Sequence, residues 1–233
     1  MLNNRLFRRT ARFFNRGGFT LVELLVFIGI IAILAGVALG PITNGIKKAK
    51  QSSGLQSAHA LGLAMYSAAN DNSQAYPDTS GGNAGNIASA LLAGGYVTDA
   101  TIFSLSGDAN ATFAKVSSST NTATTITNNQ VSWDFIGGGV SSTQYTFLPV
   151  LWSTLTGGTP PASFAVTAGQ PIVGTPASTG KNPFGTDGIA VFYVNNAAAF
   201  VNSTVSGSTL SVNMVSGTNN LGGAPAYAVR AGI

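Results

Sequence analysis

The sequence predicts an α+β protein in which a long N-terminal helix, membrane-spanning in its first half and amphipathic in its second, packs on a β-rich globular domain. Three observations predict this class: an apolar stretch from Phe19 to Gly40, a helical repeat of apolar residues after Ile42, and a remainder rich in Gly, Ser, Thr and Asn with short apolar runs. The predicted divisions are a leader at 1–18, a transmembrane helix at 19–41, an amphipathic helix at 42–72 and a globular domain at 73–233.

The leader is basic and accounts for the positive charge of the chain. It holds five of the eleven basic residues and no acidic residue. The remaining chain has six basic and seven acidic side chains, a net charge of about −1, so no nucleic-acid partner is expected. The absence of cysteine excludes thiol catalysis, disulfides and thiolate metal sites.

The apolar stretch from Phe19 to Gly40 is long enough to cross a membrane. At about 1.5 Å per residue it reaches roughly 33 Å. Its only polar side chains are Thr20 and Glu23. A carboxylate in such a segment opposes insertion by roughly 2.5 to 3.5 kcal/mol, so it requires a partner. After a cut behind Gly18, the new ammonium of Phe19 would lie one helical turn from Glu23, or beside the Glu23 of a neighbouring subunit.

Charges on the two sides of this stretch predict its orientation. Five arginines precede it and three lysines (Lys47, Lys48 and Lys50) follow it, which favours a leader on the inside and a globular domain on the outside. Two other interpretations stay open here: a secretory signal peptide cut after Ala38, and a plain single-span anchor.

The junction itself carries a family resemblance. Gly18 followed by Phe19-Thr20-Leu21-Val22-Glu23, between a basic leader and an apolar helix, resembles the class III signal of type IV pilins and type II secretion pseudopilins. The resemblance implies that a prepilin peptidase/N-methyltransferase cuts after Gly18 and methylates Phe19, and that Glu23 pairs between subunits. A weaker similarity to the helix-to-globule junction of pseudopilin-like proteins continues from Ala64 to Pro77.

The same resemblance implies a location and partners. The precursor would lie in the inner (cytoplasmic) membrane with its globular domain outside, and an assembly platform would polymerise it. The product would be a periplasmic or surface filament of this chain and other pilin-like subunits. Pilus and secretion pseudopilus, and major and minor subunit, all remain open.

Small residues in the apolar stretch predict both helix packing and a weak point. Ala32, Gly36 and Gly40 recur every four residues and form one face that lets helices approach closely in lipid. Gly36, Gly40 and Pro41 also weaken the helix, which predicts a local break there. Because filament pilins unwind in a comparable segment on assembly, the resemblance implies that this helix stretches between Gly36 and Pro41.

After Ile42 the pattern is that of an amphipathic helix that ends near Asn70–Ser73, before Pro77. Its apolar positions are Ile46, Ala49, Leu55, Ala58, Leu61, Met65 and Ala68. The single histidine, His59, lies in it without a second histidine or a cysteine to complete a usual metal or catalytic site, so we expect it to be packed or solvated.

The remainder predicts mostly strands. One short helix is expected at Ile87–Leu92, capped by Gly94-Gly95. The clearest strands are 144–152, 188–194 and 209–215. Ile189–Val194 is apolar on both faces, which predicts an interior strand covered by the long helix.

Few groups in this region suggest chemistry. No serine-hydrolase or phosphate-loop pattern is complete, so no enzyme and no cofactor is expected. The loop 181–188 faintly resembles a turn of major pseudopilins whose neighbourhood binds calcium. Asp187 is therefore the one candidate for a calcium ligand, with a plain turn as the alternative.

These features together predict a structural subunit of a type IV pilus-like or type II secretion pseudopilus filament, polymerised through its N-terminal helix. The alternative is a membrane-tethered or secreted surface- or carbohydrate-binding module with no filament role.

Overall fold

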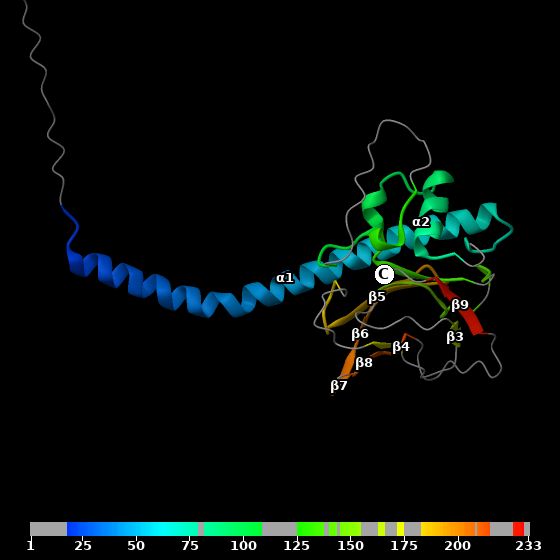
Figure 1. Cartoon of the computed structure of the whole chain (residues 1–233). Helices are drawn as coiled ribbons and strands as arrows, with labels where there is room; N and C mark the ends of the chain where they lie inside the picture. Colours follow the sequence, from blue (N-terminus) through cyan, green and yellow to red (C-terminus); the bar gives the residue numbers. More distant parts are fainter. Residues whose placement is uncertain are drawn as a thin grey trace, which may run out of the picture. The chain divides into compact units, whose positions relative to one another are not determined.

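The computed structural model of the chain describes residues 18–78, 82–108, 125–137, 140–143, 145–154, 163–165, 172–174, 183–207, 209–214 and 226–230. Contacts divide the chain into two compact units, Met1–Gly45 and Ile46–Ile233. We call them the first and second unit. The long helix α1, Leu21–Asp71, continues from the first into the second (Figure 1).

Helix α1 has 51 residues and contains Pro41 without interruption. The local break predicted at Gly36–Pro41 is therefore wrong for the single chain. Proline lacks only its own bond to the carbonyl of Val37, and the turns on both sides keep their bonds. Thr43 Oγ1 also donates to the Gly40 carbonyl at 2.8 Å.

The end of α1 agrees with the prediction. Asp71 is its last residue, and Ser73 and Gln74 then adopt the left-handed conformation, with φ of 51° and 66°. Tyr76 next donates its backbone N–H to the carbonyl of Val140 at 2.9 Å. The chain thus passes from the helix directly to a contact with the β-rich region.

The predicted short helix is confirmed as α2, Ala84–Ala93. The side chain of Asn83 accepts from the backbone N–H of Asn86 at 3.2 Å, which caps the first turn. At the other end Gly95 has φ of 73°, and the next N–H, of Tyr96, donates to Leu91 O at 3.0 Å, the pattern of a Schellman cap. Two 3₁₀ turns follow, η1 (Ala100–Phe103) and η2 (Asn128–Gln130).

The strands in the described part of the chain form two antiparallel sheets, which confirms an α+β protein (Figure 1). The six-stranded sheet has the order β3-β9-β1-β2-β5-β6, and the three-stranded sheet the order β4-β8-β7. Their bounds are β1 Trp133–Ile136, β2 Pro149–Ser153, β3 Ser163–Ala165, β4 Ile172–Gly174, β5 Gly188–Tyr193, β6 Ala198–Asn202, β7 Thr204–Ser206, β8 Thr209–Val212 and β9 Ala226–Arg230.

Two predicted strands agree well with the structure and one does not. The predicted strand 188–194 is β5. The predicted strand 209–215 is β8 over Thr209–Val212, whereas residues 213–214 are not in a strand and Val215 lies outside the described residues. The predicted strand 144–152 is wrong in its first half, because β2 begins only at Pro149. Tyr145 to Leu148 form a turn closed by the Leu148 N–H on the Tyr145 carbonyl at 2.9 Å, and Gln144 is not described.

The core of the second unit lies between α1 and the six-stranded sheet. Leu61 and Met65 of α1 are fully buried, and a Cβ placed on Gly62 would overlap the ring of Phe192 in β5. The prediction that this strand is covered by the long helix is confirmed. The predicted apolar stripe is buried only from Gly54 onward, since Ile46 and Ala49 are exposed.

Candidate functional site

The predicted cleavage site lies just before the helix. Gly18 to Thr20 have no regular secondary structure, and α1 begins at Leu21. Phe19 is 87% exposed, and a Cβ on Gly18 would meet no atom within 4 Å. The peptide bond between Gly18 and Phe19 is therefore free of helical hydrogen bonding, so a peptidase can bind it in an extended form.

Glu23 is held by Thr20 in a reciprocal cap of the helix. The backbone N–H and the hydroxyl of Thr20 both donate to Glu23 Oε2, at 2.9 and 2.8 Å. The backbone N–H of Glu23 donates in return to Thr20 Oγ1 at 3.2 Å. This is the capping box of a Thr-x-x-Glu sequence. Thr20 has a role that the sequence analysis missed, although the spacing alone could have revealed it.

Neutral donors orient the carboxylate of Glu23 but leave its charge uncompensated. Within the described part of the chain no cation pairs with it. A cut between Gly18 and Phe19 would create an ammonium beside Thr20, one helical turn from this carboxylate. The bonds from Thr20 thus hold the Glu23 carboxylate in one position, where a positively charged partner could pair with it.

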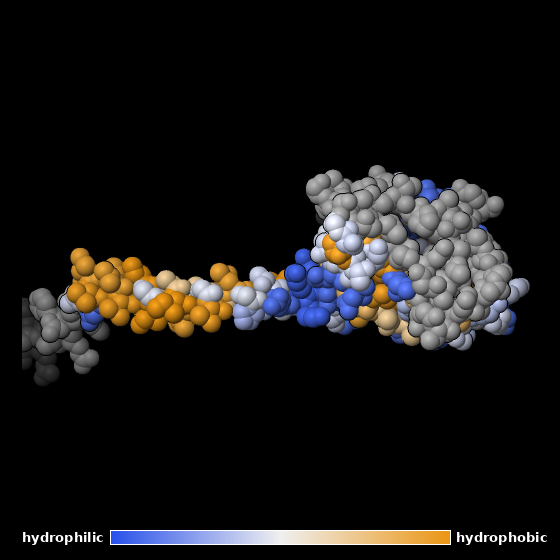
Figure 2. All heavy atoms as spheres, turned by 90° about the horizontal axis from the view of Figure 1, so that it is seen from below, coloured by the Kyte–Doolittle hydropathy of each residue, from blue (hydrophilic) through white to orange (hydrophobic). Residues whose placement is uncertain are grey.

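The helix around Glu23 exposes a long apolar surface. Sixteen large apolar side chains between Phe19 and Ile46 are at least 47% exposed. Figure 2 shows them as an orange surface along the N-terminal part of α1, followed by a blue patch. The helix is long and apolar enough to cross a membrane. A surface of this size requires lipid or protein to cover it.

The small-residue face is open in the single chain. Ala32, Gly36 and Gly40 are exposed, and a Cβ on either glycine would meet no atom within 4 Å. Gly29 has the same open surroundings and lies three residues before Ala32, so it extends the face by about one turn. Another helix could therefore approach along this side closely.

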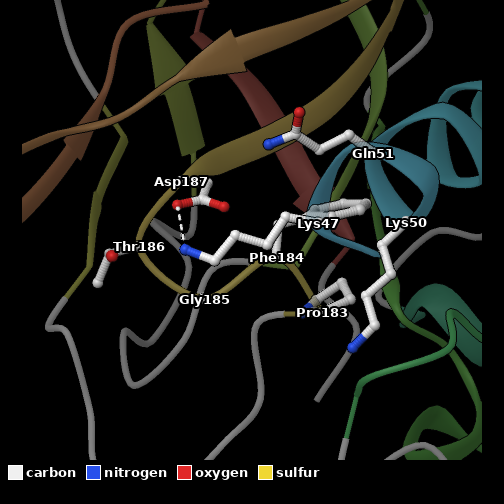
Figure 3. Close-up of a pocket in the computed structure, with 8 residues that line it drawn as sticks. All are labelled: Lys47, Lys50, Gln51, Pro183, Phe184, Gly185, Thr186 and Asp187. Atoms are coloured by element: carbon white, nitrogen blue, oxygen red, sulfur yellow. Dashed lines mark ion pairs between the residues drawn. The ribbon is translucent and has the colours of Figure 1, made fainter. Parts of the chain in front are cut away.

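A second candidate site lies around Asp187, in the second unit. Asp187 follows the loop Pro183–Thr186 and pairs with Lys47 of α1, with 3.6 Å between Oδ1 and Nζ (Figure 3). Lys47 and Lys50 both line the open cleft between this loop and the helix. Among the residues described, no three His, Cys, Asp or Glu side chains lie together. A calcium ion at Asp187 would have to displace the Lys47 ammonium. The calcium site therefore stays a prediction. Lys181 and Asn182, which belong to the same predicted loop, lie outside the described residues.

His59 and the acidic groups at the far end of α1 have structural surroundings. The exposed His59 ring meets the Phe192 ring edge-on, with centroids 6.0 Å apart. Tyr96 donates its hydroxyl to Asp71 Oδ2 at 2.9 Å, and this bond raises the pKa of Tyr96. The N–H of Thr101 on Asp99 lowers the pKa of that carboxyl and caps η1. His59 and Asp71 thus make contacts between elements, and Asp99 caps its own turn.

Comparison with known proteins identifies one segment of the chain. Residues 14–39 match the family model described as the prokaryotic N-terminal methylation motif. The match covers 26 of the 233 residues and includes Gly18, Phe19 and Glu23. No curated protein and no solved structure matches the chain. For the globular part of the second unit, the description of the fold therefore depends on the structure alone.

Proposed function

From the prepilin-type methylation motif of type IV pilins and pseudopilins, which this chain carries at residues 14–39, we propose that the protein is a structural subunit of a pilus-like or secretion pseudopilus filament. It is made as a single-pass precursor in the inner membrane with its second unit outside. A prepilin peptidase cuts it after Gly18 and methylates Phe19, and an assembly platform polymerises it through α1. The motif match is the observation that carries this proposal.

Processing is supported by the state of the scissile bond. The bond after Gly18 precedes the helix, and Phe19 is exposed. Methylation of the new terminus keeps the nitrogen basic, so the ammonium still carries its charge. The product therefore has a cation four residues before the carboxylate of Glu23.

Pairing of that cation with Glu23 supports assembly energetically. A carboxylate within the apolar stretch costs roughly 2.5 to 3.5 kcal/mol on insertion. An ion pair between this carboxylate and the new ammonium would neutralise both charges and offset that cost. Pairing between neighbouring subunits also fixes the axial register of their helices.

Burial of the exposed apolar side chains supplies the remaining drive for polymerisation. When the helix leaves the lipid, the side chains between Phe19 and Ile46 need a new cover. Neighbouring copies of the same helix provide it, and the face of Ala32, Gly36 and Gly40 lets those helices approach.

Replacement of Glu23 tests the proposal. We expect Glu23→Ala and Glu23→Gln to be cleaved after Gly18 yet to lose filaments from the sheared cell-surface fraction by tenfold or more, since about 1.4 kcal/mol per contact already gives that factor. Asp71→Asn is the matched control, because it removes a carboxylate from the same helix outside the apolar stretch.

The alternative of a tethered binding module predicts another result. In that case neither substitution at Glu23 would change the amount of protein on the cell surface or its binding there, and no filament would appear in the sheared fraction of the unaltered strain.

A further inference from the structure

An open groove lies between α1 and the segment 96–102, within the second unit. Its volume is about 460 Å³. The residues that line it include Ser57, Ala60 and Ala64 of α1 and Tyr96, Asp99 and Ile102 of that segment. Among the described residues that line the groove, Asp99 is the one with a charged side chain. The groove therefore presents a single carboxylate on a small and largely apolar wall.

The charge of Asp99 is not neutralised by a cation of the described chain. Its carboxylate accepts from the backbone N–H of Thr101 at 2.9 Å, which is a neutral donor. The one ion pair between described residues joins Lys47 to Asp187. Because Asp99 is also exposed, a cation of another molecule can reach it.

Three exposed lysines near the start of the second unit differ in what surrounds them. Lys47 pairs with Asp187, and Lys50 lines the cleft beside that pair (Figure 3). Lys48 donates to Gln51 Oε1 at 3.1 Å. This acceptor is neutral, so the charge of Lys48 stays uncompensated.

The groove and Lys48 lie on nearly opposite sides of α1. At about 100° per residue, Lys48 is turned roughly 120° to 180° from the helix residues that line the groove, whereas Lys50 is within about 80° of them. Two copies that lie side by side in the same orientation therefore bring Lys48 of one, and not Lys50, toward the groove of the other. Such a contact joins two different surfaces, so it can continue from copy to copy.

The helix between these groups allows this contact. Residues 51–70 contain no Asp, Glu, Lys or Arg, so two copies meet here without repulsion between like charges. A lysine stem can lie along apolar side chains such as Ala64 and Ile102 while its ammonium reaches a carboxylate. Lys48 precedes Ser57 and Ala64 by 9 and 16 residues. The two copies would thus be displaced by about 14 to 24 Å along α1.

We propose that the groove is the docking site for Lys48 of a second copy of this chain, with the Lys48 ammonium paired to the Asp99 carboxylate. The contact joins second units that share one orientation, as subunits anchored in one membrane do. The inference rests on the proposed filament and deepens it, because it names a contact between subunits that involves neither Glu23 nor the apolar stretch.

Zero-length cross-linking of sheared filaments tests this contact. A carbodiimide joins a lysine to a carboxylate only where the two groups touch. We expect mass spectrometry to find Lys48 linked to Asp99 in covalent dimers and not in the monomer band. Lys47 linked to Asp187 is the internal control and should appear in the monomer, since these atoms are 3.6 Å apart in one copy. The control link without dimers joined at Lys48, or dimers in which Lys50 is joined to Asp99, would overturn the proposal.

Matched substitutions test the energetic role of the pair. We expect Lys48→Gln and Asp99→Asn each to lower the filament yield about two- to fivefold, the effect of one exposed ion pair, and the double variant to lose no more than either alone. Asparagine can still cap η1. Lys50→Gln removes the same charge from the same turn and should change the yield by less than about 1.5-fold. Additive losses in the double variant, or an equal loss from Lys50→Gln, would contradict the pairing.

The results also separate this inference from the filament itself. Filaments that need Glu23 but lack the link between Lys48 and Asp99 would refute the inference and leave the filament in place, whereas a chain that forms no filament would refute both. Asp71 does not line the groove, so Asp71→Asn remains a control for Glu23. Lys48 and Asp99 are exposed, and unchanged tryptophan fluorescence should confirm that the variants fold.

Discussion

Glycines in the second half of α1 decide how closely aromatic rings lie on that helix. Phe192 of β5 packs over Gly62, where an added Cβ would overlap its ring. We expect Gly62→Ala to destabilise the second unit by about 1 to 3 kcal/mol, because the fully buried ring cannot move away without shifting the sheet. Urea unfolding followed by the fluorescence of the buried Trp133 and Trp152 measures this. Gly45→Ala is the control, since its Cβ would meet nothing; an equal loss in both variants would refute the packing account.

Tyr76, which is buried, and Tyr193, which is partly buried, differ in what their hydroxyls do. Tyr193 donates to the carbonyl of Met214 at 2.9 Å, whereas the hydroxyl of Tyr76 has no partner among the described residues. We expect Tyr193→Phe to cost about 1 kcal/mol and Tyr76→Phe to cost nothing or to stabilise the fold. The same unfolding assay compares them. Losses in the reverse order would mean that the surroundings of the two hydroxyls are misassigned.

Both tyrosines also predict how stability responds to alkali. Burial raises the pKa of Tyr76 and of Tyr193 to about 12, above the ordinary value of 10.0. Because the pKa is higher in the folded chain than in the unfolded chain, the protonated tyrosine contributes fully to folding stability below pH 10. This contribution to stability is lost as the pH rises through about 12. Melting temperatures measured from pH 8 to 12 should fall over that window. The double Tyr→Phe variant should show a shallower fall, and an unchanged slope would contradict the assignment.

At the residue scale the sequence predicted a processing site after Gly18 but not the contact between Thr20 and Glu23 beside it. Gly18, Phe19 and Glu23 follow from one charge in an apolar stretch and from the motif that contains it. Thr20 was not predicted, because a carboxylate in an apolar stretch calls for a cation, whereas the partner in the structure is the hydroxyl of a helix cap. Lys47 and Asp187 lie 140 positions apart, so no local pattern could pair them.

At the scale of elements, α1 is a continuous helix that holds its weakest turn at Gly36–Pro41. If assembly stretches this turn, Pro41→Ala should reduce filament yield, because alanine makes the helix about 3 kcal/mol harder to unwind there than proline does. Shearing and quantitative blotting measure the yield. Pro41→Gly keeps the turn weak and should leave the yield close to normal. Full yield from Pro41→Ala would show that the turn stays helical in the filament.

The strands show where the sequence pattern alone is enough to predict a strand and where it is not. β5 was predicted because it is a short apolar run that begins at Gly188, and such a run is typical of a strand that is buried on both faces. The first half of the predicted strand 144–152 failed because the turn at Tyr145–Leu148 interrupts the alternation. β6 was missed, although Asn196, with φ of 61°, marks a hairpin turn between it and β5.

At the scale of the whole molecule, the α+β class followed from the sequence, whereas the sheet order did not. β9, at the end of the described chain, pairs with β1 and β3. This pairing joins strands that are far apart in the sequence, and the residues between them do not indicate which strands pair. The division at Gly45 likewise follows from the contacts within each unit and not from a local sequence pattern.

The central claim is that this chain is cut after Gly18 and assembled through the new terminus. The measurement that tests it most directly is the mass of the amino-terminal peptide of this chain in filaments sheared from cells. The account predicts a peptide that begins at N-methylated Phe19 in that fraction. Cleavage near Ala38, or an intact arginine-rich leader confined to the membrane fraction, would contradict it.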